Sequence, residues 1–170
     1  GGGRVIVPEG VYLSNGPIHL KSNVNLHLAE SSTILFGTRT ADYLPPILMH
    51  YEGTRIYNYS PFLFAYKQKN VAVTGKGTVD GQATKVWAKW AQDPVKIERD
   101  KNVRRQNNAG VPVAERIYGE GDKIRPSFIQ FLECENVLFE DFLIIDSPFW
   151  CLHPVFCKNV TIRRIRLNTL

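Results

Sequence analysis

The chain has 170 residues, of which 44% are hydrophobic and 22% are charged, and its net charge is +5. This composition is typical of one soluble domain with a sizeable core, and no apolar run approaches the roughly 18 residues of a membrane span, so we expect no membrane partner. Three cysteines are too few for a disulfide scaffold, and the basic excess suits either an acidic partner or an ordinary solvated surface.

A short motif, Asn-Val-x-(aliphatic or Phe), recurs along the chain. Residues 1–10, GGGRVIVPEG, precede it and lack the charged and apolar segments of a secretory signal. The motif begins at Asn23 and returns at Asn70, Asn136 and Asn159, and the last two copies are 23 residues apart. A fixed offset of this kind indicates a repeat architecture.

The residues around the last two copies also match at the 23-residue offset. Each match places an apolar residue on an apolar one and follows the two-residue alternation of a half-buried β-strand. The matched pairs are Cys134 with Cys157, Val137 with Val160, Phe139 with Ile162, Phe142 with Ile165, and Ile144 with Leu167.

Two stretches interrupt the repeat. Residues 60–81 align with 126–147 at an offset of 66, so 43 residues beyond one repeat must be looped out, and the polar segment 82–125 is predicted to be that insertion. The 47 residues from Asn23 to Asn70 fit one repeat plus an insertion near 38–58, or two repeats of which one is degenerate. We therefore expect one partial domain, residues 1–170, with two insertions.

The repeat predicts an all-β parallel β-solenoid of about 23 residues per coil, because its units are short alternating segments rich in Val and Ile with Gly and Asn at corners. The LxxLxLxxN frame of leucine-rich repeats and the 3.6-residue period of helical repeats are both absent. Each coil of a solenoid stacks about 4.8 Å above the last, so residues one repeat apart form ladders along the axis.

Such ladders account for several residues without any ligand. The four repeat asparagines are expected to bond to one another at a corner, a role that outweighs the glycosylation sequon at Asn159. Cys134 and Cys157 are expected to be neighbouring buried free thiols rather than a disulfide. Two inter-coil charge pairs are expected to be weak surface stabilisers, Glu135 with Lys158 and Glu140 with Arg163.

Several of these stretches together resemble a known family. GGGRVIVPEGVY is similar to the entry coil of pectin-degrading β-helix enzymes, while GTVDGQ and RPSFIQF…SPFWCLHPV resemble successive coils of glycoside hydrolase family 28, the polygalacturonases and their relatives. The similarity covers most of the chain outside the insertions. It implies a right-handed parallel β-helix of the single-stranded, pectin-lyase-like architecture, and hydrolysis of α-linked galacturonic acid in pectin with inversion.

Inverting hydrolysis needs a carboxylic acid to protonate the leaving oxygen and a carboxylate to activate water, about 6.5–9.5 Å apart. In the family these groups belong to an Asn-Thr-Asp motif and to an Asp-Asp pair one coil later, followed by a His-Gly motif and an Arg-x-Lys motif. The Asn-Thr-Asp, Asp-Asp and His-Gly motifs do not occur in this chain. We therefore assign no catalytic residue here and expect the catalytic residues downstream of Leu170, so that the chain is the N-terminal part of such an enzyme and is inactive alone.

Asp80 and Asp146 are the carboxylates that the repeat itself could bring together. At the offset of 66 they occupy equivalent places and would lie about 5 Å apart on adjacent coils, a spacing that suits a retaining pair. The interpretation we favour is structural, because each aspartate ends a coil and caps a turn through its own backbone.

The stretch SPFWCLHPV, residues 147–155, is expected to line a cleft. Strand alternation puts Trp150 and His153 on opposite sides unless the corner at Ser147 and Pro148 turns the chain. An aromatic ring stacks on sugar rings, and a histidine can donate to a uronate carboxylate, so both are predicted substrate contacts. The alternative is that His153 forms a satisfied polar pair with Gln130, 23 residues earlier.

The insertions supply two further predicted substrate contacts, because long loops on a rigid solenoid usually carry the binding surface. These are Tyr59, at the end of the first insertion, and Arg125, at the end of the second, whose guanidinium fork matches a carboxylate. The expected partner is an acidic polysaccharide, pectin or galacturonan, and not a nucleic acid. No metal site and no cofactor are expected, and the last coil offers a surface for self-association.

We therefore predict that the chain is part of a secreted or periplasmic glycosidase that cleaves pectin, a polymer of the plant cell wall. Two other classes stay open. One is a non-catalytic β-helix with a carbohydrate-binding or structural role. The other is a β-helix polysaccharide lyase, against which the lack of an aspartate cluster for Ca²⁺ counts.

Overall fold

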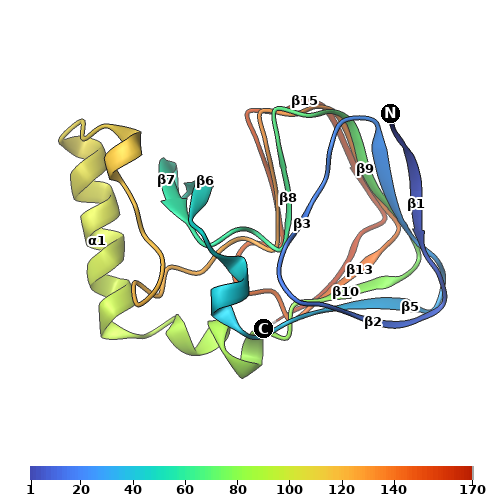
Figure 1. Cartoon of the computed structure of the whole chain (residues 1–170), viewed down its shortest axis with the longest axis horizontal. Coiled ribbons are helices and arrows are strands. Elements are labelled where there is room, and N and C mark those ends of the chain that lie inside the picture. The colour runs from blue at the N-terminus through green and yellow to red at the C-terminus, as the bar shows by residue number, and fades with distance from the viewer. Residues whose placement is uncertain (170) are drawn as a thin grey trace.

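The computed structural model describes residues 1–169, which form a parallel β-helix with two excursions (Figure 1). Seen end-on, three sheets make the sides of a triangular prism. Their strand orders are β1-β4-β9-β12-β15 in sheet A, β16-β13-β10-β5-β2 in sheet B and β14-β11-β8-β3 in sheet C. All neighbouring strands within these sheets are parallel, so each coil passes through sheets A, B and C in turn and the predicted solenoid is confirmed.

The strands are short, as the alternating pattern predicts. Sheet A comprises β1 (Gly3–Val7), β4 (Val24–Leu28), β9 (Lys69–Gly75), β12 (Glu135–Glu140) and β15 (Lys158–Arg163). Sheet B comprises β2 (Gly10–Ser14), β5 (Ser32–Phe36), β10 (Thr78–Asp80), β13 (Leu143–Ile145) and β16 (Arg166–Asn168). Sheet C comprises β3 (Ile18–His19), β8 (Leu63–Tyr66), β11 (Ile129–Leu132) and β14 (Leu152–Val155).

The 23-residue offset holds in all three sheets between the last two coils. It pairs Val137 with Val160, Ile144 with Leu167 and Gln130 with His153. These pairs are the ones that the sequence match predicts.

The offset of 66 holds in two sheets and fails in the third. It pairs Val71 with Val137 in sheet A and Leu63 with Ile129 in sheet C. In sheet B the offset is 65, so Asp80 pairs with Ile145 and the predicted equivalence of Asp80 and Asp146 is wrong. The cause is the corner between sheets A and B, which has one residue more after β9 than after β12.

The core is the inside of the prism, filled by every second residue of each strand. The burial alternation is clearest in β5 and β12. Phenylalanines stack along the axis near the corner between sheets B and C, with ring centroids of Phe36 and Phe62 5.2 Å apart and those of Phe62 and Phe128 5.3 Å apart. Burial of such large rings contributes much of the favourable free energy of folding.

The predicted asparagine ladder is confirmed. The Nδ2 group of Asn70 donates to Asn23 Oδ1 at 2.7 Å, Asn136 donates to Asn70 at 2.8 Å, and Asn159 donates to Asn136 at 3.0 Å. All four residues have positive φ, between 54° and 65°. Asparagine tolerates this left-handed backbone, and its amide both donates and accepts, which is why it recurs at this corner.

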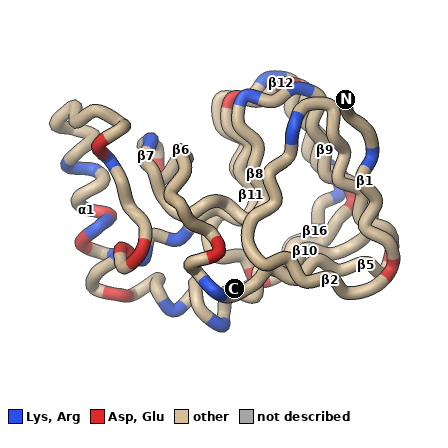
Figure 2. Tube along the Cα trace, in the orientation of Figure 1, with Lys and Arg blue, Asp and Glu red and all other residues tan. Residues whose placement is uncertain are grey.

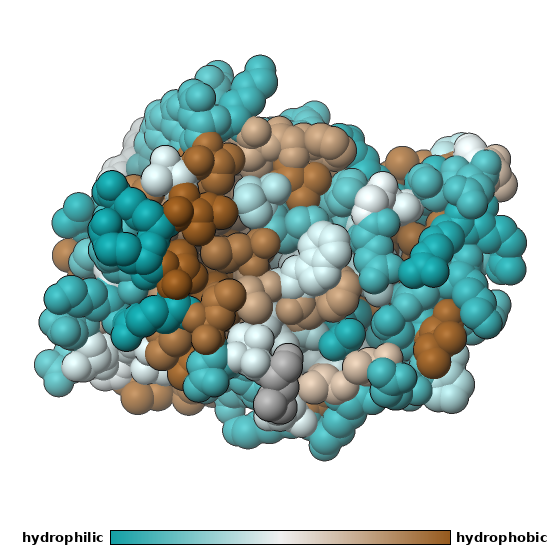
Figure 3. All heavy atoms as spheres, turned by 180° about the vertical axis from the view of Figure 1, so that it is seen from behind, coloured by the Kyte–Doolittle hydropathy of each residue, from teal (hydrophilic) through white to brown (hydrophobic). Residues whose placement is uncertain are grey.

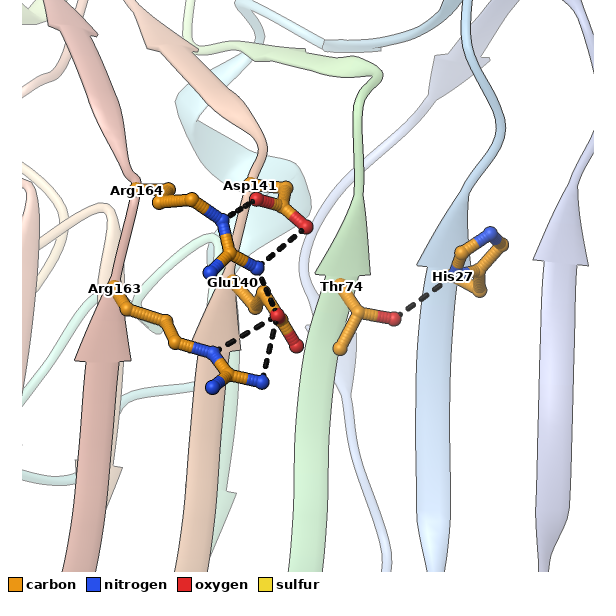
Figure 4. Close-up of polar contacts among 6 residues, drawn as sticks. All are labelled: His27, Thr74, Glu140, Asp141, Arg163 and Arg164. Atoms are coloured by element: carbon orange, nitrogen blue, oxygen red, sulfur yellow. Dashed lines mark hydrogen bonds and ion pairs between the residues drawn. The ribbon is translucent and has the colours of Figure 1, made fainter.

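The other predicted ladders are confirmed in part. Cys134 and Cys157 are free thiols, with the Cys134 backbone N–H 3.4 Å from Cys157 Sγ, although Cys157 is only half-buried. Arg163 bonds to Glu140 at 2.8 Å, and Arg164 adds contacts to Glu140 and Asp141 (Figure 4).

Glu135 departs from the expected charge pair. It lies opposite Lys158 in the register, yet its ion pair is with Lys69 on the other side, at 3.0 Å. The outer face of sheet A also carries a hydrogen bond between His27 Nδ1 and Thr74 Oγ1, 2.9 Å apart (Figure 4). Figure 2 shows acidic and basic residues interspersed along the second excursion and at the solenoid corners, with few along sheets B and C.

Both excursions leave the prism at the corner between sheets B and C. The first follows β5 and contains the short helix η1 (Thr40–Tyr43) and an antiparallel hairpin of β6 (Ile47–Tyr51) and β7 (Thr54–Asn58). The second follows β10 and contains η2 (Ala83–Lys85), η3 (Trp87–Trp90), the helix α1 (Pro94–Asn108) and η4 (Val113–Glu115). Hairpin and helix enclose a small second core of Met49, Tyr51, Ile56, Val103, Tyr118 and Ile124.

The end of the solenoid at β15 and β16 presents an apolar band (Figure 3). Val160, Ile162 and Leu167 are 37%, 47% and 58% exposed there. Leu170, downstream of which we expect the catalytic residues, lies outside the described residues. Across residues 1–169, no helix has both the length and the apolar character needed to cross a membrane.

Candidate functional site

The outer face of sheet C, beside its corner with sheet B, carries Trp150 and His153, two of the four predicted substrate contacts. Segment 146–151 forms this corner in the fourth coil, directly after the coils from which the two excursions leave. The hairpin and α1 stand beyond this face (Figure 1). The fold thus brings His50, on β6, next to His153, on β14, with ring centroids 5.9 Å apart.

His153 is held by two side chains of the preceding coil. Its Nδ1 atom lies 2.8 Å from Gln130 Nε2 and 3.1 Å from Ser127 Oγ. Gln130 is fully buried, and it also bonds to the backbone of His50. The polar pair of His153 with Gln130 is therefore present, and it leaves the second imidazole nitrogen free of protein partners among the described residues.

Trp150 lies against His153 on the same surface. The two rings meet edge to face with centroids 4.3 Å apart, because bends before β14 turn the chain as the corner at Ser147 and Pro148 suggested. Phe149 stacks on Trp150 at 5.4 Å, and Tyr51 of the hairpin stacks on Phe149 at 5.4 Å. Trp150 is 42% exposed, so this supported indole offers an open apolar surface for a sugar ring.

Arg125 lies beneath this aromatic stack. Its guanidinium is 5.1 Å from the centre of the Phe149 ring, and its Nη1 donates to Pro148 O at 3.1 Å. Burial lowers the pKa of Arg125, and its Nε has no hydrogen-bond partner in the described structure. The side chain supports the segment that carries Trp150, and its contact with substrate stays a prediction.

Tyr59 does not lie on the binding surface. It is 2% exposed, and its ring packs against Trp87 and Trp90 with centroids 5.5 and 5.7 Å away. The expectation of a substrate contact is corrected on this ground, because a ring enclosed by other rings has no free face for a sugar. Its place at the end of the first excursion makes it an anchor of that excursion on the core.

Several residues of this surface could not be predicted from the sequence. His50 and Arg55 come from the hairpin, and Phe156, 63% exposed, follows β14. The His50 ring lies 5.4 Å from Phe156, Arg55 sits over the same Phe156 ring at 5.4 Å, and Arg55 pairs with Glu133 at 2.5 Å. No repeat signal marks the hairpin residues, since an insertion has no equivalent in the other coils.

The two histidines are neutral at ordinary pH. Burial, and then the nearby His50, lower the pKa of His153 from 6.5 to about 4. Burial and the positive charge of Arg55 also lower the pKa of His50. The pair can exchange hydrogen bonds with a ligand at neutral pH, but it cannot supply a positive charge.

Asp80 and Asp146 both accept hydrogen bonds that hold the backbone in place. Asp80 accepts from the backbone N–H of Gln82 at 2.8 Å, which confirms its role in a turn. Asp146 instead accepts from both the backbone N–H and the hydroxyl of Thr84 in the preceding coil, so the expected bond to its own turn is wrong. Both aspartates are committed to structural contacts.

The Arg-x-Lys motif and the metal-ligating residue types can also be placed. The single Arg-x-Lys sequence of the chain, Arg99 to Lys101, lies on α1, where Arg99 pairs with Asp122 and Lys101 with Glu98. It is engaged in ion pairs of the second excursion, away from the solenoid strands. Within residues 1–169 there is no group of three or more His, Cys, Asp or Glu side chains that could hold a metal ion.

Comparison with known proteins extends this picture. No family model matches the chain. The structure of a hyperthermoactive exopolygalacturonase from Thermotoga maritima is 45% identical over 99% of this chain, with a TM-score of 0.94. The chain belongs to glycoside hydrolase family 28. The Yersinia enterocolitica family 28 exopolygalacturonase, 20% identical over 99% of the chain with a TM-score of 0.68, shares the fold.

A curated relative from Vitis vinifera, named "Probable polygalacturonase", is 22% identical over 98% of this chain. The chain spans 30% of that protein, 40% of the Thermotoga chain and 33% of the Yersinia chain. It therefore corresponds to a part of these relatives, and the right-handed parallel β-helix of family 28 is its fold.

Proposed function

We propose that the protein containing this chain is a polygalacturonase-like glycoside hydrolase that cleaves α-linked galacturonic acid in pectin with inversion. The observation that carries the proposal is the 45% identity to the Thermotoga maritima exopolygalacturonase across 99% of the chain. Both solved relatives named above are exopolygalacturonases, so we also propose that the protein releases its product from polysaccharide ends.

In this proposal the chain contributes part of the β-helix and one wall of the binding site. Trp150 would stack on a sugar ring and His153 would donate to a uronate carboxylate, since one is exposed and the other has a free imidazole nitrogen on the same surface. Asp80 and Asp146 are held by other groups, so the acid and the base of an inverting reaction would come from residues downstream of Leu170.

The partner in this proposal is an acidic polysaccharide, galacturonan, which carries one carboxylate per sugar. Such a polymer is met outside the cytoplasm, and we propose a secreted or periplasmic location on that basis. Fractionation of the source cells, followed by immunodetection, tests the location, and a purely cytoplasmic signal would contradict it.

Two proteins test the activity: the product of the whole gene and the 170-residue chain alone. The whole protein should release reducing ends from polygalacturonate, and proton NMR of the first product should show inverted anomeric configuration. Monogalacturonate as the first product supports exo action. Retention of configuration, or an unsaturated product typical of a lyase, would refute the proposed mechanism, and turnover by the 170-residue chain would refute the placement of the catalytic residues.

A further inference from the structure

The buried amide of Gln130 has only one orientation that satisfies its surroundings. Its Oε1 accepts from the backbone N–H of His50 at 2.8 Å, and its Nε2 donates to the carbonyl oxygen of the same residue at 2.8 Å. A flipped amide would set NH₂ against N–H and oxygen against oxygen, leaving two buried groups unpaired. The hairpin backbone therefore fixes which end of the Gln130 amide faces sheet C.

This orientation decides the tautomer of His153. The second hydrogen of Gln130 Nε2 points at His153 Nδ1, 2.8 Å away, so Nδ1 must accept it and cannot itself carry a proton. In the neutral imidazole the proton then sits on Nε2. His153 Nε2 has no protein partner in the described structure and is not among its buried unpaired atoms, so this N–H is open to a ligand.

The surroundings favour this neutral form. Within residues 1–169, the titratable side chain that faces His153 is His50, and Arg55 and Glu133 lie beyond it and pair with each other at 2.5 Å. Burial and His50 together lower the pKa of His153, which agrees with a ring that accepts at Nδ1.

We propose that Gln130 is a positioning residue, which locks His153 as a neutral Nε2–H donor, and that this donor rather than an imidazolium meets the carboxylate of a uronide. The inference rests on the proposed function for its ligand, but the tautomer rests on the hydrogen-bond network alone. A neutral donor keeps the same hydrogen bond over the whole range in which the uronide is ionised. Uronide binding by this contact should therefore vary little between pH 5 and pH 8.

Two variants of Gln130 test the lock, by which we mean that Gln130 fixes the proton of neutral His153 on Nε2. Both variants are made in the protein expressed from its whole gene. Gln130→Glu replaces the donating NH₂ with an acceptor, so His153 should take its proton on Nδ1 and its pKa should rise. Gln130→Met removes the donor without adding a charge, so the two tautomers should mix. The matched control is Gln68→Glu, because the Gln68 amide bonds to Ser22 and Tyr66 and does not contact His153.

The first readout is NMR of protein labelled with ¹⁵N-histidine, assigned with His153→Asn. In the unaltered protein and in Gln68→Glu, the His153 Nδ1 signal should be that of an unprotonated nitrogen and the Nε2 signal that of a protonated one. In Gln130→Glu the pattern should reverse, and in Gln130→Met it should average. A protonated Nδ1 in the unaltered protein, or an unchanged pattern in both Gln130 variants, would overturn the lock.

The second readout is calorimetric binding of galacturonate, with galactose as the uncharged comparison. The Gln130→Glu variant loses a hydrogen bond to a charged group, so at pH 7 it should bind galacturonate about 10-fold or more weakly than the unaltered protein does. Its affinity for galactose should stay within about 3-fold of that of the unaltered protein. Binding by Gln130→Glu should strengthen again as pH falls through the pKa of His153 measured by NMR, whereas simple repulsion by the new carboxylate would follow no such pKa.

The outcomes separate this inference from the proposed function. A reversed tautomer with unchanged galacturonate binding would refute the role of His153 as the uronide donor, while hydrolysis of polygalacturonate by the unaltered protein would still support the proposed function. Absence of hydrolysis with the predicted tautomers and binding would refute the proposed function and retain the lock.

Discussion

The asparagine ladder allows a prediction that separates hydrogen bonding from backbone geometry. Asn136 lies inside the ladder, where it donates to Asn70 at 2.8 Å and accepts from Asn159 at 3.0 Å, and its φ is 57°. Asn23 lies at the end of the ladder, where it accepts one ladder bond, from Asn70 at 2.7 Å, and its φ is 65°. The two positions thus share a backbone conformation and differ in the number of ladder bonds.

The expected costs follow from that difference. Asn136→Gly keeps the left-handed conformation and loses two hydrogen bonds, each about 0.5 kcal/mol at this exposed corner, and adds roughly 0.5–1 kcal/mol of chain entropy. The total is about 1.5–2 kcal/mol of unfolding free energy. Asn23→Gly loses one bond and should cost about 0.5 kcal/mol less. Asn136→Ala should cost about 2–3 kcal/mol, because a side chain other than Asn or Gly is strained by about 1–2 kcal/mol at this φ.

Urea unfolding followed by tryptophan fluorescence measures these differences, and hydrogen exchange at the amides of β12 and β15 locates them. Equal costs for Asn136→Gly and Asn23→Gly would show that the inner ladder bond contributes nothing. A smaller cost for Asn136→Ala than for Asn136→Gly would refute the argument from the left-handed backbone.

Four other changes test the core, the surface and the site. Phe139→Ala removes a fully buried ring and should lower the free energy of unfolding in urea by about 3–5 kcal/mol. Arg164→Ala removes an exposed ion-pair partner and should shift the urea midpoint much less than Phe139→Ala does, an effect that salt should diminish further. The pKa of His153 is lower in the folded state than the ordinary value of 6.5, so the unfolded chain binds a proton first and the free energy of unfolding should fall as pH drops from 6.5 to about 4. His153→Leu should flatten that part of the stability profile. Trp150→Ala should weaken binding of oligogalacturonate in calorimetry about 3- to 10-fold while the protein stays folded by circular dichroism.

The sequence predicts the solenoid well because its evidence is repeated. Each coil repeats the same alternation, so the pairing of Val137 with Val160 and the ladder at Asn136 both follow from one offset. The prediction that Asp80 and Asp146 are equivalent is wrong for a related reason. One extra residue at a single corner changes the register of sheet B and leaves the registers of the two other sheets unchanged. A repeat predicts spacing along the chain, and only the corners decide how that spacing is divided among sheets.

The excursions could be predicted as interruptions, but their structure could not. The segment 82–125 contains α1, although the helix begins with recognisable signals, Asp93 as N-cap accepting from Val95 N–H and Pro94 in the first turn. Its apolar pattern is weak, because only Asp100 and Val103 are buried along its length. A helix with so few buried side chains gives little periodicity, and its position depends on the hairpin against which it packs.

The candidate site shows why its residues were only partly predictable. Trp150 and His153 belong to a repeating strand and corner, where a resemblance and a register could point to them. Their chemistry is decided by contacts to Tyr51 and to the His50 backbone, which belong to an excursion with no counterpart in other coils. The backbone of the hairpin, more than its side chains, orients Gln130. Sequence change in the hairpin can therefore leave the His153 tautomer intact as long as the hairpin backbone keeps its place over sheet C.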